Sequence, residues 1–415
     1  MVSTAFYLAL MGIAFVVTTL VYPYVLRFAV KHRVVDNPCA RKLQRVPVPV
    51  MGGTAIFIGL TLTAGICYAV VPDPVLVQTW CLLLVMYAIG VWDDVKDVSA
   101  AFRFLAESVI VWLMIWLLDV RINDFHGLWG IRQIPDVVSV PLSIVAGVGI
   151  MNAVNLIDGV DGYCSAYGMV TCGGFAVFFF YADDMAMFSL ALITIGALAP
   201  FFLHNVFGRT SKMFLGDGGS LMLGTLLTLF TLRLLSGNSL NAQYGYMGLS
   251  LPAMALALLS VPVFDTLKVM IFRVVRGVSP FSPDKTHLHH LFIEMNFSHL
   301  ATALLIVSVN VLIVVALVAA WLLGMPIDQQ VYLVVLLSLL FTCVFYFLME
   351  RERRKRNGEG SRFWVKCCQR GKSTNLSATP LWQLLRRIMD SRLLGAGLAK
   401  DPPAVDPGPD EADQT

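Results

Sequence analysis

The sequence predicts an all-α fold, a polytopic bundle of transmembrane helices. Of its 415 residues, 57% are hydrophobic and only 14% are charged, and the mean hydropathy is +0.74. One soluble core cannot bury so many apolar side chains, so lipid must be the solvent for most of them. The apolar residues also lie in runs long enough to cross about 30 Å of hydrocarbon. Together these observations indicate a multi-pass membrane protein.

About eleven apolar runs follow one another along the chain. We expect membrane-spanning helices near residues 4–29, 51–71, 77–92, 102–120, 137–154, 163–181, 185–204, 218–236, 250–271, 300–324 and 330–349. The first run has almost no positive charge before it and ends without a small-residue cleavage pattern. We therefore expect it to be retained as a span and not removed as a signal peptide.

The charges of the connecting loops predict the orientation. The connection at residues 31–50 contains five Lys or Arg residues, so it should be cytoplasmic. With alternate loops inside, the cytoplasmic loops before the C-terminal tail carry twelve Lys and Arg residues, and the opposite loops carry only Arg121 and Arg132. We expect the N-terminus outside and the C-terminus in the cytoplasm.

Cysteine spacing and net charge give no support for a zinc-binding or a nucleic-acid-binding protein. The eight cysteines form no CxxC pair and no Cys/His spacing typical of zinc sites. The net charge of +3 gives no support for a nucleic-acid partner, because nearly half of the Lys and Arg residues follow position 350.

The segment 151–162 is the most informative stretch, because it carries two amides and two carboxylates between two apolar runs. These are Asn152, Asn155, Asp158 and Asp161. Such oxygen ligands, with glycines that allow close approach, suit a hard cation and phosphate. If the fifth span continues as a helix, the first three lie along one side and Asp161 extends the row. Asx-turns and helix caps are the alternative, but a cap needs one such residue and not four.

Two further acidic motifs also end or begin apolar runs. Asp93 and Asp94 are adjacent carboxylates that stay ionised more easily beside a cation; a solvated helix end is the alternative. Asp217 lies between glycines in the motif 216–220, directly before an apolar run. It can cap the following helix, or bind a metal while backbone amides contact phosphate oxygens.

A histidine cluster occupies the longest cytoplasmic connection before the tail. His287, His289 and His290 follow Asp284 and Lys285. The HxHH pattern lacks the i, i+4 spacing of a helical zinc pair and has no cysteine nearby. Hydrogen bonds to diphosphate oxygens are a better use for these imidazoles, and a solvated loop is the remaining alternative.

All four motifs fall on cytoplasmic connections in this topology, and the opposite loops contain no comparable cluster. Polar groups delivered to one face suit a reaction between a cytosolic and a membrane-borne substrate. Asp265 and Lys268 in the ninth run are spaced to form a pair, for which a functional and a structural role stay open, as they do for Glu107.

In this order the motifs resemble the polyprenyl-phosphate N-acetylhexosamine-1-phosphate transferases, of the glycosyltransferase family 4 type. The resemblance covers roughly residues 5–350 and includes Asp36-Asn37-Pro38, Arg41-Lys42, Pro47, Pro49 and Gly52-Gly53 besides the motifs above. The final Ser-Pro-Phe…Asp…His-Leu-His-His motif is similar to the bacterial undecaprenyl-phosphate N-acetylglucosamine-1-phosphate transferases. The peptidoglycan branch typically has three consecutive histidines, and the eukaryotic dolichol-phosphate relatives lack the cluster.

The resemblance implies transfer of an N-acetylhexosamine-1-phosphate from a UDP-amino sugar to undecaprenyl phosphate, with release of UMP. N-acetylglucosamine is the commonest sugar of this branch; N-acetylgalactosamine and deoxy-amino sugars stay open, as do a homodimer and a one-step or two-step mechanism. The implied product starts an O-antigen, common-antigen or teichoic-acid glycan at the bacterial cytoplasmic (inner) membrane, with the active site facing the cytoplasm. A secondary transporter is the alternative from another class, but it predicts midplane carboxylates and an inverted repeat.

The resemblance also implies residue roles around a Mg²⁺ ion, for which Mn²⁺ could substitute. Asp217 with Asn155 would bind the metal, and Asp93 and Asp94 would lie near the carrier phosphate. The other implied roles are nucleotide-sugar binding and support for Asp158 and Asp161, contact with the diphosphate for His287, His289 and His290, and substrate binding for Arg41, Lys42, Asn152, Asn155, Gly216 and Lys285.

The chain divides into a membrane transferase domain, residues 1–350, and a cytoplasmic tail, residues 351–415. The tail begins with a basic cluster at 351–356, continues to a segment near 380–389 compatible with a short interfacial helix, and ends in a Pro-rich acidic stretch expected to be disordered. The sequence assigns no catalytic role to the tail, and truncation after about residue 355 is expected to leave activity in detergent largely intact.

Overall fold

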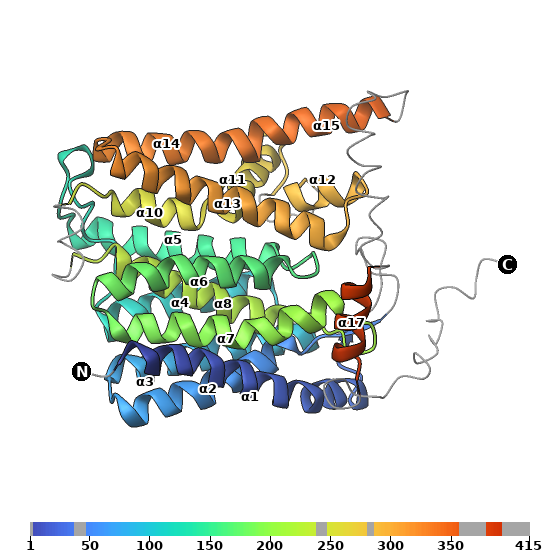
Figure 1. Ribbon diagram of the computed structural model, residues 1–415. Helices are drawn as coiled ribbons and strands as arrows, with labels where there is room; N and C mark the ends of the chain where they lie inside the picture. The colour runs from blue at the N-terminus through green and yellow to red at the C-terminus, as the bar shows by residue number, and fades with distance from the viewer. Residues whose placement is uncertain (1–2, 37–46, 238–246, 280–285, 357–378, 392–415) are drawn as a thin grey trace.

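The computed structural model describes residues 3–36, 47–237, 247–279, 286–356 and 379–391. Within them the chain forms a bundle of long helices that run side by side (Figure 1). The first helices are α1 (Thr4–Lys31), α2 (Gly52–Val70), α3 (Pro74–Lys96), α4 (Ala100–Leu118), α5 (Asp136–Leu156), α6 (Tyr163–Tyr181), α7 (Met185–Phe207) and α8 (Gly216–Leu234). The later helices are α10 (Leu251–Leu258), α11 (Ser260–Val275), α12 (Leu288–Glu294), α13 (His299–Leu322), α14 (Ile327–Leu339), α15 (Phe345–Arg356) and α17 (Pro380–Met389).

Short elements complete the described chain. A 3₁₀ turn, η1 (Leu128–Gly130), precedes α5, and a π-helical segment, η2 (Leu340–Val344), joins α14 to α15. The strands β1 (Val35–Asp36) and β2 (Val48–Pro49) pair antiparallel. The prediction of an all-α polytopic protein is confirmed.

Nine of the described helices are long and apolar enough to cross a membrane. The pair α10 and α11, bent by 77° at its break, makes a tenth if it is counted as one span. The run expected near 218–236 corresponds to α8, which is not among these helices because Asp217, Arg233 and several glycines lower its hydropathy. The multi-pass character is therefore clear, whereas the count of eleven stays a prediction.

The break between α10 and α11 was not expected from the continuous apolar run at 250–271. Asn310 of α13 satisfies the backbone at this point: its Nδ2 donates to the Leu258 carbonyl at 3.1 Å, and its Oδ1 accepts from Ser260 Oγ at 2.8 Å and Val261 N–H at 3.3 Å. Irregular backbone within a bilayer is tolerated where protein groups supply the missing hydrogen bonds.

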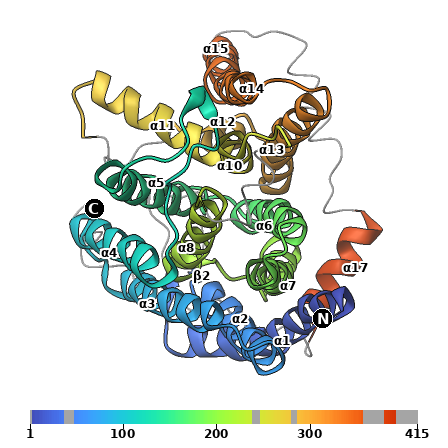
Figure 2. The same cartoon turned by 90° about the vertical axis from the view of Figure 1, so that its left-hand side faces the viewer.

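The polar helix α8 runs through the middle of the first half of the molecule. In the end-on view it is surrounded by α2, α3, α5, α6 and α7, and the later helices α10 to α15 form a second group beyond α5 and α6 (Figure 2). Almost every residue of α8 is buried. Because neighbouring helices cover it, α8 does not need the apolar composition of a lipid-facing helix.

Glycines bring α2 and α3 into backbone contact with the start of α8. A Cβ at Gly53 would lie 2.4 Å from the backbone nitrogen of Gly219, and a Cβ at Gly90 would lie 2.5 Å from the carbonyl oxygen of Asp217. The segment before α8 is also paired with β2, since Phe214 N–H donates to the Pro49 carbonyl at 2.8 Å. The start of α8 is thus held from three sides.

The ends of α3, α5, α7 and α11 and the starts of α4, α6 and α8 lie at the same end of the bundle as α12 and α17. We call it the α12 end; it is on the right in Figure 1. The four motifs singled out in the sequence fall on these helix ends and on the turns next to them.

We predict that Gly53→Ala destabilises the protein, because its methyl group would overlap the α8 backbone. Overpacking of this kind costs about 1–3 kcal/mol, which should appear as a lower melting temperature in detergent. Gly65→Ala is the matched control in the same helix, since a Cβ there meets nothing within 4 Å. Equal melting temperatures for the two variants would contradict the close contact.

Candidate functional site

Asp94 links the end of α3 to the start of α8. The two adjacent carboxylates lie within the last turns of α3, which continues to Lys96 and so passes beyond the expected end of this span. The Asp94 carboxylate accepts hydrogen bonds from the backbone N–H groups of Asp217 at 2.8 Å and Gly218 at 3.1 Å. The N-cap residue of α8, Leu215, gives no side-chain cap. Asp94 therefore satisfies two free amides of α8 and places negative charge at the positive end of its dipole.

Asp217 lies in the first turn of α8 and contacts α5. Asn155 Nδ2 donates to Asp217 Oδ1 at 2.5 Å and to Ser220 Oγ at 2.9 Å. Gly216 has φ +75°, and a Cβ there would lie 2.6 Å from Asp94 Oδ2. Only glycine combines this backbone conformation with so close a carboxylate. The ends of α3 and α5 and the start of α8 therefore meet at one point.

Asp158 and Asp161 lie in the turn between α5 and α6. The helical row with the two asparagines required the fifth span to continue as a helix, and this condition is not met because α5 ends at Leu156. The chain then turns through residues 157–162, and Gly162, at the N-cap of α6, has φ +77°. Asp158 consequently reaches the start of α8 from a turn and not from a helix face.

Four carboxylates gather around this turn. Burial raises the pKa of Asp158 well above its ordinary value, and the charges of Asp217, Asp94 and Asp161 raise it further, against a hydrogen bond with the Gly216 backbone that lowers it. Such mutual repulsion requires the carboxylates to lie near one another. Without a cation, these surroundings therefore favour the protonated form of Asp158.

Asp161, by contrast, is paired with two basic side chains. Its Oδ2 lies 2.7 Å from Lys212 Nζ and 2.8 Å from His299 Nδ1. Burial acts to raise the pKa of Asp161, but His299 and Lys212 outweigh it and hold the pKa below its ordinary value. Asp161 is therefore ionised at neutral pH.

Asp265 holds the start of the histidine cluster. Its Oδ2 lies 2.9 Å from Nδ1 of His287, the N-cap residue of α12, and its carboxylate also accepts from the Leu288 N–H at 3.2 Å. Lys268 Nζ donates to Asp265 Oδ1 at 2.5 Å. The pair expected from the i, i+3 spacing is present, and through His287 it connects α11 with α12.

His289 is buried against the turn between α5 and α6. A Cβ at Gly159 would lie 3.4 Å from His289 Nε2, and the His290 and His287 rings have centroids 4.4 and 5.5 Å from the His289 ring. Burial lowers the pKa of His289 well below its ordinary value, and the neighbouring His290 and His287 lower it further. At neutral pH the imidazole is uncharged, so it can donate or accept a hydrogen bond but adds no positive charge.

Asp93 belongs to a second network on the α4 side. Val98 N–H donates to Asp93 Oδ1 at 2.7 Å, and Arg103 lies 3.4 Å from Asp93 Oδ2. Arg103 also lies 3.7 Å from the buried Glu107, which accepts a hydrogen bond from Asn152. The adjacent carboxylates at the end of α3 therefore have different partners, and so do the two asparagines of α5.

Three expected binding residues, Arg41, Lys42 and Lys285, lie outside the described residues. The other expected site residues all lie at the α12 end, and their chemical roles stay predictions.

Sequence reasoning missed the basic partners of these carboxylates. Lys212 and Arg103 entered only the loop charge count, and His299 and Ser220 were given no role. Lys212 precedes the Gly216 motif by four residues, a nearness that could have drawn attention to it. Spacing alone, however, names no partner for a basic side chain.

Among the described residues, no group of three or more His, Cys, Asp or Glu side chains is arranged to hold a metal ion by itself. Mg²⁺ at phosphate-transfer sites often takes only one or two carboxylates, with water and substrate phosphate completing its shell. Asp217 and Asn155 offer a carboxylate and an amide, and the nearby Asp158 carries repulsion that a divalent cation would relieve. The residues present therefore fit such a cation.

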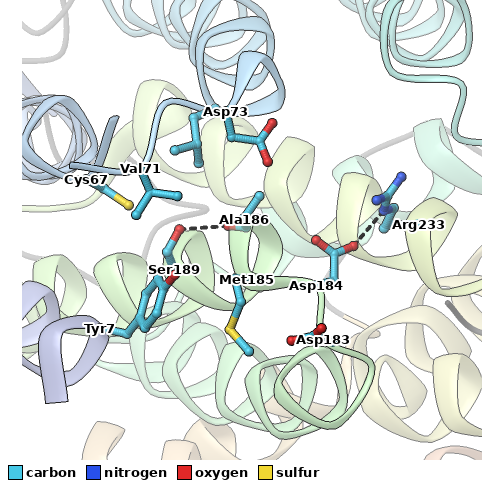
Figure 3. Close-up of a pocket in the computed structure, with 11 residues that line it drawn as sticks. Tyr7, Cys67, Val71, Asp73, Asp183, Asp184, Met185, Ala186, Ser189 and Arg233 are labelled. Atoms are coloured by element: carbon cyan, nitrogen blue, oxygen red, sulfur yellow. Dashed lines mark hydrogen bonds and ion pairs between the residues drawn. The ribbon is translucent and has the colours of Figure 1, made fainter. Parts of the chain in front are cut away.

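A pocket of about 240 Å³ lies at the opposite end of the bundle, lined in part by Asp73, Asp183, Asp184 and Arg233 (Figure 3). Asp73 and Asp184 cap α3 and α7 by accepting backbone hydrogen bonds, and Asp184 is also paired with Arg233 at 2.7 Å. The sequence predicted no comparable cluster at this end. Two of the three carboxylates at this pocket therefore already have structural roles, as helix caps and in an ion pair.

Comparisons with known proteins match the region that carries the three acidic motifs, and the family model ends before the histidine cluster. The family model described as glycosyl transferase family 4 matches residues 76–235. The chain is 30% identical over 303 residues to the probable undecaprenyl-phosphate N-acetylglucosaminyl 1-phosphate transferase of Bacillus subtilis (strain 168), covering 71% of this chain and 80% of the relative.

Two further relatives have similar coverage. The chain is 31% identical over 327 residues to the decaprenyl-phosphate N-acetylglucosaminephosphotransferase of Mycolicibacterium smegmatis, covering 72% of this chain and 78% of the relative. It is 26% identical over 287 residues to the undecaprenyl-phosphate alpha-N-acetylglucosaminyl 1-phosphate transferase of Escherichia coli (strain K12), covering 68% and 76%.

We predict that Asp161→Asn lowers the melting temperature at neutral pH. The pKa of Asp161 is held below its ordinary value, so its ion pairs contribute stability above the unfolded pKa of about 4 and lose it as the pH falls through the folded pKa. The difference between the wild type and Asp161→Asn should therefore shrink below pH about 4. Asp97→Asn, at an exposed carboxylate, is the control; a difference independent of pH would contradict the ionised pairing.

Proposed function

Since the chain belongs to the glycosyl transferase family 4, we propose that it transfers N-acetylglucosamine-1-phosphate from UDP-N-acetylglucosamine to undecaprenyl phosphate, releasing UMP. The observation that carries the proposal is the meeting of Asp94, Asn155 and Asp217 at the start of α8, beside the turn bordered by His289. This end of a multi-pass bundle is where a water-soluble nucleotide sugar and the phosphate of a membrane lipid can meet.

We assign a Mg²⁺ ion to Asp217 with Asn155, supported by the nearby carboxylate repulsion. When bound, the ion would neutralise phosphate charge during the displacement. Asp94 keeps the start of α8 in place by binding its amides, so the Asp217 side chain stays directed toward α5. Positioning of this kind supplies much of the catalysis of phosphoryl transfer, in which both partners are anionic.

His289 is assigned to the diphosphate of the sugar nucleotide as an uncharged hydrogen-bond partner, consistent with its burial. His287 and Asp265 hold the start of the α12 helix that carries it. Asp161, with Lys212, lies on the other side of the same turn and is assigned to the nucleotide sugar. Asp93, with Arg103, is assigned to the lipid phosphate at the end of α3.

The cellular setting belongs to the same proposal. The loop charges favour the α12 end facing the cytoplasm of a bacterium, where the nucleotide sugar is made, with the bundle in the inner membrane. A lipid-linked glycan of the O-antigen, common-antigen or teichoic-acid type would follow. Other UDP-amino sugars stay open as donors, because the described residues do not include the whole of the predicted substrate-binding set.

The proposal is tested with the purified full-length protein in lipid nanodiscs. We expect UMP to form only when UDP-N-acetylglucosamine, undecaprenyl phosphate and Mg²⁺ are all present, EDTA to abolish it, and Mn²⁺ to restore part of it. Asp217→Asn should lower the rate by at least about a hundredfold. Asp97→Asn, which makes the same change of charge at an exposed position, is the control. If UMP were released only with a different UDP-amino sugar, the proposed donor would be wrong. Uptake of substrate without UMP release would favour a transporter.

We predict that His289→Gln retains more activity than His289→Ala. A glutamine amide can still donate a hydrogen bond to a phosphate oxygen, and the native imidazole is uncharged at neutral pH. We expect a loss of about ten- to a hundredfold for His289→Ala, as for one hydrogen bond to a charged group, and a smaller loss for His289→Gln, measured as UMP formation at pH 7.5. If a third variant, His289→Lys, were the most active of the three, the site would require a positive charge at this position and the role of an uncharged hydrogen-bond partner would be wrong.

A further inference from the structure

The helix α17 lies across the α12 end of the bundle (Figure 1). It packs against the end of α7, where the rings of Trp382 and Phe207 have centroids 4.7 Å apart. Thr379 caps its first turn by accepting the Trp382 N–H at 3.3 Å. The tail therefore contains a defined helix with a defined place on the membrane domain.

Asp390, the residue after α17, binds the loop between α7 and α8. Its carboxylate accepts the backbone N–H groups of Arg209, Thr210 and Ser211, each at 3.1 Å, and the Ser211 hydroxyl at 3.0 Å. Hydrogen bonds to an ionised acceptor are stronger than neutral ones, and consecutive amides that converge on one carboxylate form an anion-binding turn. Four donors from three consecutive residues thus depend on a side chain 179 positions later.

This loop leads directly into the candidate site. Lys212 comes next in the chain and forms the 2.7 Å contact with Asp161. The following residues are held by the membrane domain itself, since Asn205 Nδ2 donates to the Met213 carbonyl at 2.8 Å and Phe214 pairs with β2. Tyr22 OH also donates to the Ser211 carbonyl at 2.8 Å, and His204 Nδ1 lies 3.0 Å from Ser211 Oγ. Asp390 is therefore one of three side chains that hold the entrance of the loop, and the only one of them that binds the amides of residues 209–211. The start of α8 holds its exit, and Lys212 lies between them.

We propose that Asp390 is a positioning residue for the transferase reaction, acting through the α7–α8 loop on Lys212 and Asp161. This inference rests on the proposed function for its catalytic consequence. Without the carboxylate, the backbone N–H groups of Arg209 to Ser211 form hydrogen bonds with water instead, and the loop samples other conformations. Lys212 then spends less time beside Asp161, and binding of the nucleotide sugar weakens. Sequence reasoning had treated this tail as dispensable; the contacts of Asp390 favour the opposite for α17.

The structural half of the proposal is tested by amide hydrogen exchange on the full-length protein in nanodiscs, without substrate. The amides of residues 209–211 should exchange more slowly in the wild type than in Asp390→Ala, with Asp390→Asn between them. Leu384→Ala is the matched control, since it lies on α17 with a side chain that is 53% exposed. Unchanged exchange of this loop in Asp390→Ala would overturn the proposal.

The catalytic half is tested by steady-state kinetics of UMP release. We expect Asp390→Ala to raise the KM for UDP-N-acetylglucosamine about tenfold and to leave the KM for undecaprenyl phosphate unchanged. A chain ending at residue 356, after α15, should behave in the same way. A lower active fraction with both KM values unchanged would show a purely structural role and overturn the positioning role.

A double variant identifies the route. If Asp390 acts through Lys212, then Asp390→Ala should add little to the KM effect of Lys212→Met, whereas independent effects would multiply. Multiplied effects would overturn this route. Because hydrogen exchange needs no turnover, loss of loop protection in a protein that makes no UMP would count against the proposed reaction and not against the binding of the loop by Asp390.

Discussion

The backbone contact at the start of α8 is the constraint on which the rest of the site depends. Glycines of α2 and α3 let these helices approach α8 until no side chain fits between them. Asp94 can then reach the free amides of α8 across that contact. The same contact directs Asp217 toward α5 and sets the separation of the carboxylates, so the geometry of the site follows from the packing of three helix ends.

The carboxylates around the start of α8 fall into two groups that differ in their partners. Asp161, Asp265 and Asp93 each have basic partners, which compensate the cost of burying a charge. Asp158 faces other carboxylates instead, and Asp217 accepts a hydrogen bond from the uncharged amide of Asn155. Carboxylates this close together are costly to ionise unless a cation joins them, which is why the two groups receive different roles in the proposed reaction.

The sequence predicted the helices well because membrane spans must be apolar along most of their length, and it predicted one end of the bundle as the functional end from the loops that carry the motifs. It could not predict that Asp94 would cap α8, because contact between positions 94 and 217 leaves no local pattern. It also left open whether α5 continues through Asp158, since spacing alone does not show where a helix stops. The contacts of Asp390 could not be predicted for another reason. The residue lies in a polar tail, and its partners are mainly backbone amides, which every sequence possesses.

The Asn310 side chain gives the break between α10 and α11 a fixed angle. If α11 swung away, the Leu258 carbonyl and the Val261 amide would lose their hydrogen bonds to Asn310, and unpaired backbone groups are costly within a bilayer. The joint should therefore behave as a rigid elbow and not as a hinge. Asp265, which holds the start of the histidine cluster, lies on α11. The direction of α11 therefore depends on the Asn310 side chain of α13, which lies well outside the reaction centre.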